Sequence, residues 1–173
     1  AEFVVMLHPD NQYDARMVSV LVEIRTLGKC DVVLGNRIRS RGEALAGGMP
    51  RWKYFANRLS TAVENFVLGQ TLGDFHSGMR AYTREVLEVI PFDNNSDDFA
   101  FDQELLVQAA APGFVMGDVP VPVRYMPESS SINFRRSLAY AVGGLSVVLA
   151  YALHRTRIRA DRRFSFRREA VSY

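Results

Sequence analysis

The strongest constraint on the fold of this chain is a strand–helix–strand pattern at its beginning. The apolar run Phe3–Leu7 is followed by a helical pattern over residues 15–27 and then by a second apolar run over 31–34. The helical pattern keeps apolar side chains on one face and stops at Gly28, a residue that commonly ends helices. Such a unit is typical of a parallel α/β sheet, where ligands bind beyond the carboxyl ends of the strands. The sequence therefore predicts an α/β fold with a mixed, mostly parallel sheet flanked by helices.

The rest of the chain predicts further elements of the same fold. Pro50 suits the first turn of a helix that ends at Gly69. One face of this helix is apolar, which predicts either burial in the core or, with Lys53 and Arg58 nearby, contact with a membrane interface. We expect this apolar face to consist of Trp52, Phe55, Leu59, Ala62, Val63 and Phe66. The other expected elements are a loop over 38–49, a strand over 80–82, helices over 83–90, 101–111 and 134–153, and an extended edge segment over 114–125.

Length and composition fit one globular domain. The chain has 173 residues, 48% of them apolar and 23% charged, which excludes a disordered segment and a small disulfide scaffold. Cys30 is the single cysteine, so no internal disulfide can form. We expect the fold proper to occupy residues 1–153 and a basic tail to occupy 154–173.

Charge is unevenly distributed between these two parts. Residues 155–169 hold seven arginines against two acids, while the remaining 14 basic and 17 acidic residues leave the body mildly negative. A basic tail indicates an anionic partner such as a membrane surface or a nucleic acid, or simply a solvated chain end.

The longest apolar stretch is too short to cross a bilayer. It covers the 16 residues 138–153, about 24 Å as a helix against a hydrocarbon core of about 30 Å. This helix therefore lies in the core or on a membrane interface. No signal peptide opens the chain. We expect a cytoplasmic location, and contact with the inner face of a membrane stays open.

Polar side chains follow the first predicted strand. The segment His8-Pro9-Asp10-Asn11-Gln12 places a carboxylate and an amide oxygen two residues apart. Hard cations such as Mg²⁺ and Mn²⁺ bind oxygen ligands of this kind, often together with substrate phosphates. A turn after proline is the alternative interpretation of the same residues.

A second polar cluster is the loop over 71–80, which carries Asp74, Ser77 and Arg80. A loop with an acid and an arginine between a helix and a strand can place a base beside a phosphate clamp. A third cluster over 97–104 holds four carboxylates at a helix start, where acids also favour the helix dipole.

Together these motifs resemble the family-two glycosyltransferases of the GT-A fold. The resemblance rests on HPDNQYD, DVVLGNR, LGDFHSGMRAYTREVL, NNSDDFAFDQELL and VPVRYMPESSSINF, and it runs from Phe3 to about Leu153. It is closest to the branch with dolichyl-phosphate mannosyltransferase and bacterial polyprenyl-phosphate sugar transferases. It implies a Rossmann-like sheet and identifies residues 1–153 as the C-terminal two-thirds of such a domain, without the N-terminal nucleotide-binding half.

The resemblance also implies roles for particular residues. Asp10 and Gln12 match the family's metal-binding loop, and His8 stands where its first acid often lies, which favours softer transition metals. Asp74 and Arg80 match the catalytic loop, the aspartate as base or orienting group and the arginine as a phosphate ligand. The substrate- and phosphate-binding residues implied in the same way are Asn36, Arg37, Ser77, Asp102, Glu104, Arg124 and Ser131.

The reaction that the resemblance implies is inverting transfer of a sugar from a nucleotide-diphosphate sugar to a polyprenyl (dolichyl-type) phosphate, with Mg²⁺ or Mn²⁺ as cofactor. A soluble saccharide hydroxyl is the alternative acceptor, and it requires a general base that an ionised phosphate does not need. A non-catalytic fragment that binds anionic partners through its basic tail is a second alternative. No nucleic-acid partner is expected for the enzyme, and a homo-oligomer stays open.

Overall fold

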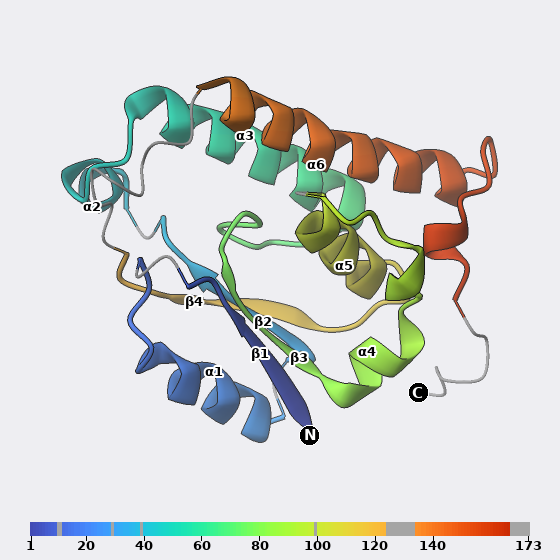
Figure 1. Cartoon of the computed structure of the whole chain (residues 1–173), viewed down its shortest axis with the longest axis horizontal. Coiled ribbons are helices and arrows are strands. Elements are labelled where there is room, and N and C mark those ends of the chain that lie inside the picture. Colours follow the sequence, from blue (N-terminus) through green and yellow to red (C-terminus); the bar gives the residue numbers. More distant parts are fainter. Residues whose placement is uncertain (10–11, 29, 39, 99, 124–133, 167–173) are drawn as a thin grey trace.

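The computed structural model describes residues 1–9, 12–28, 30–38, 40–98, 100–123 and 134–166 of the chain. Its centre is a four-stranded sheet with helices on both faces (Figure 1). The strands occur in the order β1-β3-β2-β4. Their bounds are β1 Phe3–Leu7, β2 Val32–Asn36, β3 Met79–Thr83 and β4 Met116–Pro120. The predicted α/β class is confirmed.

The sheet is mixed, as predicted, but the expectation that it is mostly parallel is wrong. β3 lies between β1 and β2 and runs antiparallel to both, and only β2 and β4 pair in parallel. A strand–helix–strand pattern fixes the relative direction of two strands, but it does not reveal that a later strand inserts between them. β1, β2 and β4 still run the same way, so their carboxyl ends share one edge with the start of β3.

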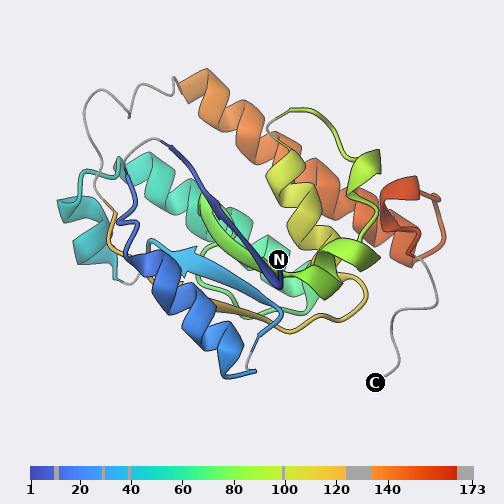
Figure 2. The ribbon, with the colours of Figure 1, turned by 60° about the horizontal axis from the view of Figure 1, so that its bottom comes forward.

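Helices cover the two faces of the sheet unequally (Figures 1 and 2). On one face α1 (Met17–Thr26) packs through Leu21 against strand residues such as Val33 and Ala81. The other face carries the larger core. That core is formed with α3 (Arg51–Leu68), α4 (Arg84–Val89), α5 (Phe101–Ala110) and α6 (Phe134–Arg155).

Local signals explain several helix boundaries. Thr83 accepts a hydrogen bond from the Val86 amide and begins α4 as predicted. Gly69 ends α3 in the left-handed region at φ 68°. The expected loop over 38–49 contains a helix instead, α2 (Arg41–Ala46), because the Ser40 hydroxyl accepts from the Glu43 amide at its start.

Unlike an ordinary surface helix, α3 buries a polar face and exposes an apolar one. Asn57, Ser60, Thr61 and Glu64 are buried, and we call these four residues the inner face of α3. The prediction that the apolar face is buried in the core is wrong, because Phe66 is 89% exposed and Leu59 is 69% exposed. Contact with a membrane interface stays a prediction. The outer face of α3, as used below, consists of Trp52, Phe55, Leu59, Val63 and Phe66.

The chain after α6 packs back onto the domain as far as it is described. Phe164, in the 3-10 turn η2 (Arg162–Phe164), is only 3% exposed and joins the larger core. Arg163 pairs with Glu104 and Asp161, both at 2.6 Å. The first part of the expected basic tail is therefore integral to the fold. Of the helices that the structure describes, none is long and apolar enough to span a membrane.

Candidate functional site

The candidate site lies at the sheet edge where β1 and β2 end and β3 begins. His8 follows β1, Arg37 follows β2, and the segment 73–78 leads into β3. The mixed topology thus brings together side chains from three separate motifs, because β3 enters the sheet at the edge where its neighbours leave it.

Arg37 and Asp74 form a buried, bidentate ion pair. The Arg37 Nε donates to Asp74 Oδ2 at 2.6 Å and its Nη2 to Oδ1 at 3.0 Å. Asn57 from α3 donates to the same Oδ1 at 3.1 Å, and so does the His76 amide at 2.9 Å. The Asp74 side chain is completely buried. Each of its oxygens therefore has a donor.

This surrounding sets the charge of Asp74. Burial by itself would raise the pKa of Asp74, but the charge and hydrogen bonds of Arg37, with His76 and Asn57, outweigh burial and hold the pKa well below its ordinary value. The carboxylate is ionised at neutral pH. It is a weak base, and it has no exposed oxygen with which to take a proton.

Lys53 adds positive charge to this part of the site. Burial and the neighbouring charge of Arg37 lower the pKa of Lys53, while Asp74 opposes the change. Two cations therefore lie near one carboxylate. Positive side chains at this place favour a phosphate group.

Arg80 is buried beneath the site and bonds to backbone. Its guanidinium donates to the carbonyl oxygens of Ser77 at 2.7 Å and Phe75 at 3.0 Å, and to that of Asp102 at the start of α5. These bonds shape the loop before β3 and attach it to α5. The phosphate role of Arg80 stays a prediction, and in this structure the side chain is 0% exposed.

Ser77 is also buried, where its Oγ accepts from the Met79 amide at 3.3 Å. The neighbouring Gly78 donates its amide to the Tyr13 hydroxyl at 2.8 Å. A Cβ at Gly78 would lie 2.5 Å from Nδ1 of His8, so only glycine allows the histidine to lie this close.

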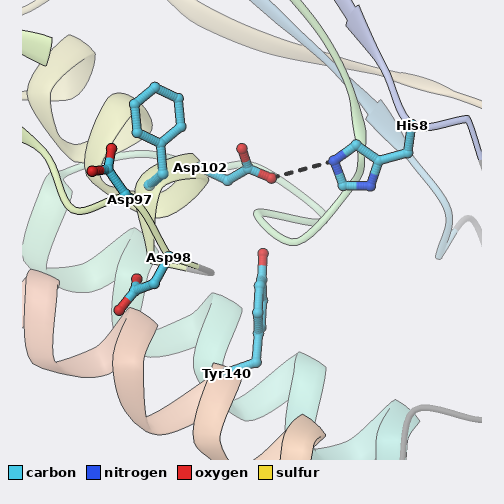
Figure 3. A pocket seen from close by; sticks show the side chains of 6 residues that line it. His8, Asp97, Asp98, Asp102 and Tyr140 are labelled. Carbon is cyan, nitrogen blue, oxygen red and sulfur yellow. Dashed lines mark ion pairs between the residues drawn. The ribbon is translucent and has the colours of Figure 1, made fainter.

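His8 and Asp102 meet in an open pocket of about 660 Å³ beside this edge (Figure 3). The His8 Nε2 lies 3.4 Å from Asp102 Oδ2, and the Tyr140 hydroxyl of α6 points toward the space between them. Burial would raise the pKa of Asp102, but the hydrogen bond to His8 and the charge of Arg80 lower it. Asp97, Asp98 and Phe101 complete the lining.

The structure describes only part of the predicted metal-binding loop. Asp10 lies outside the described residues, and His8 and Gln12 lie within them. Across the described residues, no group of three histidine, cysteine or acidic side chains could hold a metal ion. An imidazole nitrogen at this loop fits a transition metal such as Mn²⁺ better than Mg²⁺.

The remaining predicted residues lie in different surroundings. Asn36 donates to Asp118 of β4 at 3.2 Å and accepts from the Ile38 amide. Glu104 bonds to the Ser96 amide and to Arg163. Arg124 and Ser131 lie outside the described residues.

Sequence reasoning missed several residues that build the site. Asn57 and Lys53 come from α3, Tyr140 comes from α6, and Asp118 accepts from the Gly73 amide. One signal was available. Polar residues at 57, 60, 61 and 64 repeat at helical spacing and mark a polar face that is able to line a buried site.

Comparison with known proteins identifies relatives in Haloferax volcanii. The glycosyltransferase AglJ is 31% identical over 133 residues, which cover 77% of this chain and 42% of AglJ. A dolichyl-phosphate hexose transferase is 36% identical over 94 residues, which cover 54% of this chain and 38% of that protein. The low-salt glycan biosynthesis hexosyltransferase Agl6 is 29% identical over 133 residues, covering 76% of this chain and 31% of Agl6.

The chain spans less than half the length of these three relatives. No family model matches it, and no solved structure matches it. The relatives and the motif series nevertheless agree with each other. The chain is therefore a homologue of haloarchaeal glycosyltransferases and resembles family-two glycosyltransferases in its motifs.

Proposed function

We propose that the protein transfers a sugar from a nucleotide-diphosphate sugar to a polyprenyl (dolichyl-type) phosphate, with inversion at the anomeric carbon. An oxygen of the acceptor phosphate forms the new bond to that carbon while the bond to the nucleotide diphosphate breaks. The leaving diphosphate keeps the electron pair of the broken bond.

The observation that carries this proposal is the surrounding of Asp74. A hydroxyl acceptor must lose a proton as it attacks. This requires a general base with a suitable pKa within hydrogen-bond reach of the hydroxyl. Asp74 is fully buried, ionised and saturated with donors, so it is poorly suited to that task. A phosphate acceptor with a second pKa of about 6 is already ionised and needs no base.

The cations of the site agree with a phosphate acceptor. Asp74 holds Arg37 in place, and Lys53 lies close enough for Arg37 to affect its pKa. In this account Asp74 is a positioning residue for the phosphate ligands. One of the relatives is named as a dolichyl-phosphate hexose transferase, which supports the same class of acceptor.

The outer face of α3 supports an acceptor that lies in a membrane. It is an apolar strip about 20 Å long, at ~1.5 Å per residue. Among the exposed side chains of α3, all of which the structure describes, the charged ones are Arg51 and Arg58, and none is acidic. An apolar helix face with aromatic and basic residues is typical of helices that lie in the headgroup region of anionic bilayers.

For the cofactor we propose a divalent ion, preferably Mn²⁺, held by Asp10 and Gln12 with His8 nearby. Such an ion would neutralise charge on the leaving diphosphate. We expect one of UDP-, GDP- or dTDP-sugar to raise the melting temperature of the protein, and we expect this rise only when Mn²⁺ is present. An equal rise without the metal would contradict the cofactor proposal.

A second candidate function rests on the His8–Asp102 pair. An imidazole held by a carboxylate and open to a pocket can take a proton from a hydroxyl. That arrangement favours transfer to a saccharide hydroxyl. His8→Gln would then reduce turnover strongly, whereas a phosphate acceptor requires no base at this position.

The two candidates differ in their product. The purified protein is given a labelled nucleotide-sugar, Mn²⁺ and vesicles that contain polyprenyl phosphate. We expect label in the organic phase, in a lipid whose mass equals the polyprenyl phosphate plus one sugar. Label that enters only water-soluble saccharides added to the same mixture would overturn the proposal.

A further inference from the structure

A second buried carboxylate, Glu64, lies directly behind the site and is not used by the proposed reaction. It belongs to the inner face of α3 and is 0% exposed. Its Oε1 accepts from Gln103 of α5 at 3.2 Å and lies 3.6 Å from Nε2 of His76. Its Oε2 has no hydrogen-bond partner within the described part of the chain.

Within the described residues, no arginine or lysine forms an ion pair with Glu64. Arg80 of β3 is the nearby guanidinium; it donates to backbone carbonyl oxygens and acts on Glu64 through its charge. His76 is buried, and burial lowers its pKa to about 4, so the imidazole is neutral at physiological pH. From α6, Gly144 faces Glu64 without a side chain. The other charged group that acts on Glu64 is the Asp74 carboxylate, which repels it.

His76 connects Glu64 to the site. Its ring lies next to Glu64 on one side and meets the Tyr140 ring edge-on, with centroids 6.0 Å apart. Its backbone amide donates to Asp74 Oδ1 at 2.9 Å. A displacement of the imidazole therefore reaches both Asp74 and the pocket residue Tyr140.

We propose that Glu64 is a positioning residue that works in its protonated, neutral form, holding His76 and with it the segment 73–77 that carries Asp74. A neutral carboxyl fits a buried environment with one amide donor and no directly paired arginine or lysine among the described residues. An ionised carboxylate in the same place would be a second buried negative charge near Asp74. This inference goes beyond the proposed reaction and holds for either acceptor.

The protonation state of Glu64 follows from the same contacts. Burial, followed by the charge of Asp74, raises the pKa of Glu64 to about 8, and Arg80 opposes the rise. Loss of the proton to solvent above this pH would push the carboxylate away from Asp74. We expect the segment 73–77 to change its conformation in that range.

Nuclear magnetic resonance on the folded chain tests this without any assay of sugar transfer. The side-chain carboxyl carbon of Glu64 and the amides of residues 74–77 are followed from pH 5.5 to 9.5. We expect the carboxyl carbon to titrate near pH 8 and the amides to shift with the same midpoint. A carboxyl carbon that titrates near 4.5, the ordinary value, would overturn the proposal, as would amides that do not follow it.

Two substitutions separate positioning from simple packing. Glu64→Gln copies the neutral acid and should keep the neutral-pH amide shifts of 74–77 at all pH values. Glu64→Leu keeps the volume but cannot accept from Gln103, so it should displace those amides even at pH 6. The matched control is Glu104→Gln, another buried glutamate, which should leave the transition near pH 8 in place. Retention of that transition in Glu64→Gln would also overturn the proposal, and none of these results depends on the reaction catalysed.

Discussion

Two buried carboxylates near one loop illustrate how differently a protein can treat the same chemical group. Asp74 and Glu64 are both completely buried, and both lie next to His76. Asp74 has Arg37, Asn57 and a backbone amide as donors, whereas Glu64 has one amide donor and an unpartnered oxygen. Asp74 is consequently held ionised, and Glu64 is held neutral.

The difference shows that burial alone does not decide the charge of an acid. Burial raises the pKa of both groups, and at Asp74 the directly bonded Arg37, with His76 and Asn57, outweighs it, whereas at Glu64 the charge of Arg80 does not. The two acids also have different consequences for function. An ionised, saturated Asp74 can hold phosphate-binding cations, while a neutral Glu64 can contact the neighbouring imidazole without adding charge.

The largest expected effect is the removal of Asp74. Asp74→Ala leaves the Arg37 guanidinium buried without its partner, which should lower the free energy of unfolding by about 3–5 kcal/mol at pH 7. Because the pKa of Asp74 is lowered in the folded state, the ionised group stabilises the fold above its unfolded pKa of 3.8. The deficit should therefore shrink as the pH falls below about 4. Urea denaturation at pH 7 and pH 3 checks this, and a deficit under about 1 kcal/mol at pH 7 would contradict the buried ion pair.

The second effect has the opposite sign. Between its unfolded pKa of 4.5 and about 8, folded Glu64 keeps a proton that the unfolded chain has lost. The stability of the wild type therefore falls as the pH rises through this window and levels off above it. Glu64→Gln has no such slope and should be more stable at pH 8 by on the order of 2–4 kcal/mol, with no gain below pH 4.5. A Glu64→Gln protein that is less stable than the wild type at pH 8 would be inconsistent with a neutral Glu64.

A smaller effect on stability is expected at Asn57, the residue that links the inner face of α3 to Asp74. Asn57 lies on the inner face of α3 with Glu64 and donates to Asp74. Asn57→Ala removes one donor while the Arg37 pair remains, so we expect a loss of about 1 kcal/mol in the free energy of unfolding. The matched control is Asn65→Ala on the same helix, which removes two hydrogen bonds to the backbone of Leu72 in the loop after α3. If Asn57→Ala cost as much as Asp74→Ala, the role given to Arg37 would be wrong.

The smallest effect on stability is expected on the outer face of α3. Phe66→Ser replaces a side chain that is 89% exposed, so the free energy of unfolding should change by less than about 0.5 kcal/mol. Sedimentation with anionic lipid vesicles should nevertheless decrease. Leu149→Ser on α6, where Leu149 is 60% exposed, is the control. A large loss of stability with Phe66→Ser would show that this face is covered by protein and not by lipid.

Most local elements of this fold could be predicted from the sequence. The strand–helix–strand start, the Thr83 cap and the Gly69 stop depend on neighbouring residues, and all three are confirmed. The insertion of β3 between β1 and β2 could not be predicted, because it depends on pairing between strands far apart in the chain.

The orientation of α3 shows where hydrophobic patterning fails. An apolar face ordinarily predicts the buried side of a helix, and here Glu64, Thr61 and Asn57 are buried because they surround a polar site. The loops that the motifs singled out lie together in the structure, as the Arg37–Asp74 and His8–Asp102 contacts show. They could not reveal that Arg80 bonds to backbone or that Glu104 pairs with Arg163, since both depend on tertiary contacts.

The most direct test of the proposed function compares two acceptors that differ only in the attacking group. Polyprenyl phosphate and the corresponding polyprenol are supplied at equal concentration in the same vesicles, with the nucleotide-sugar and Mn²⁺. An enzyme without a general base for hydroxyl groups should form only the phosphate-linked product, and His8→Gln should still form it when Mn²⁺ is supplied in excess. Transfer to the polyprenol, abolished by His8→Gln, would contradict the account and favour a hydroxyl acceptor.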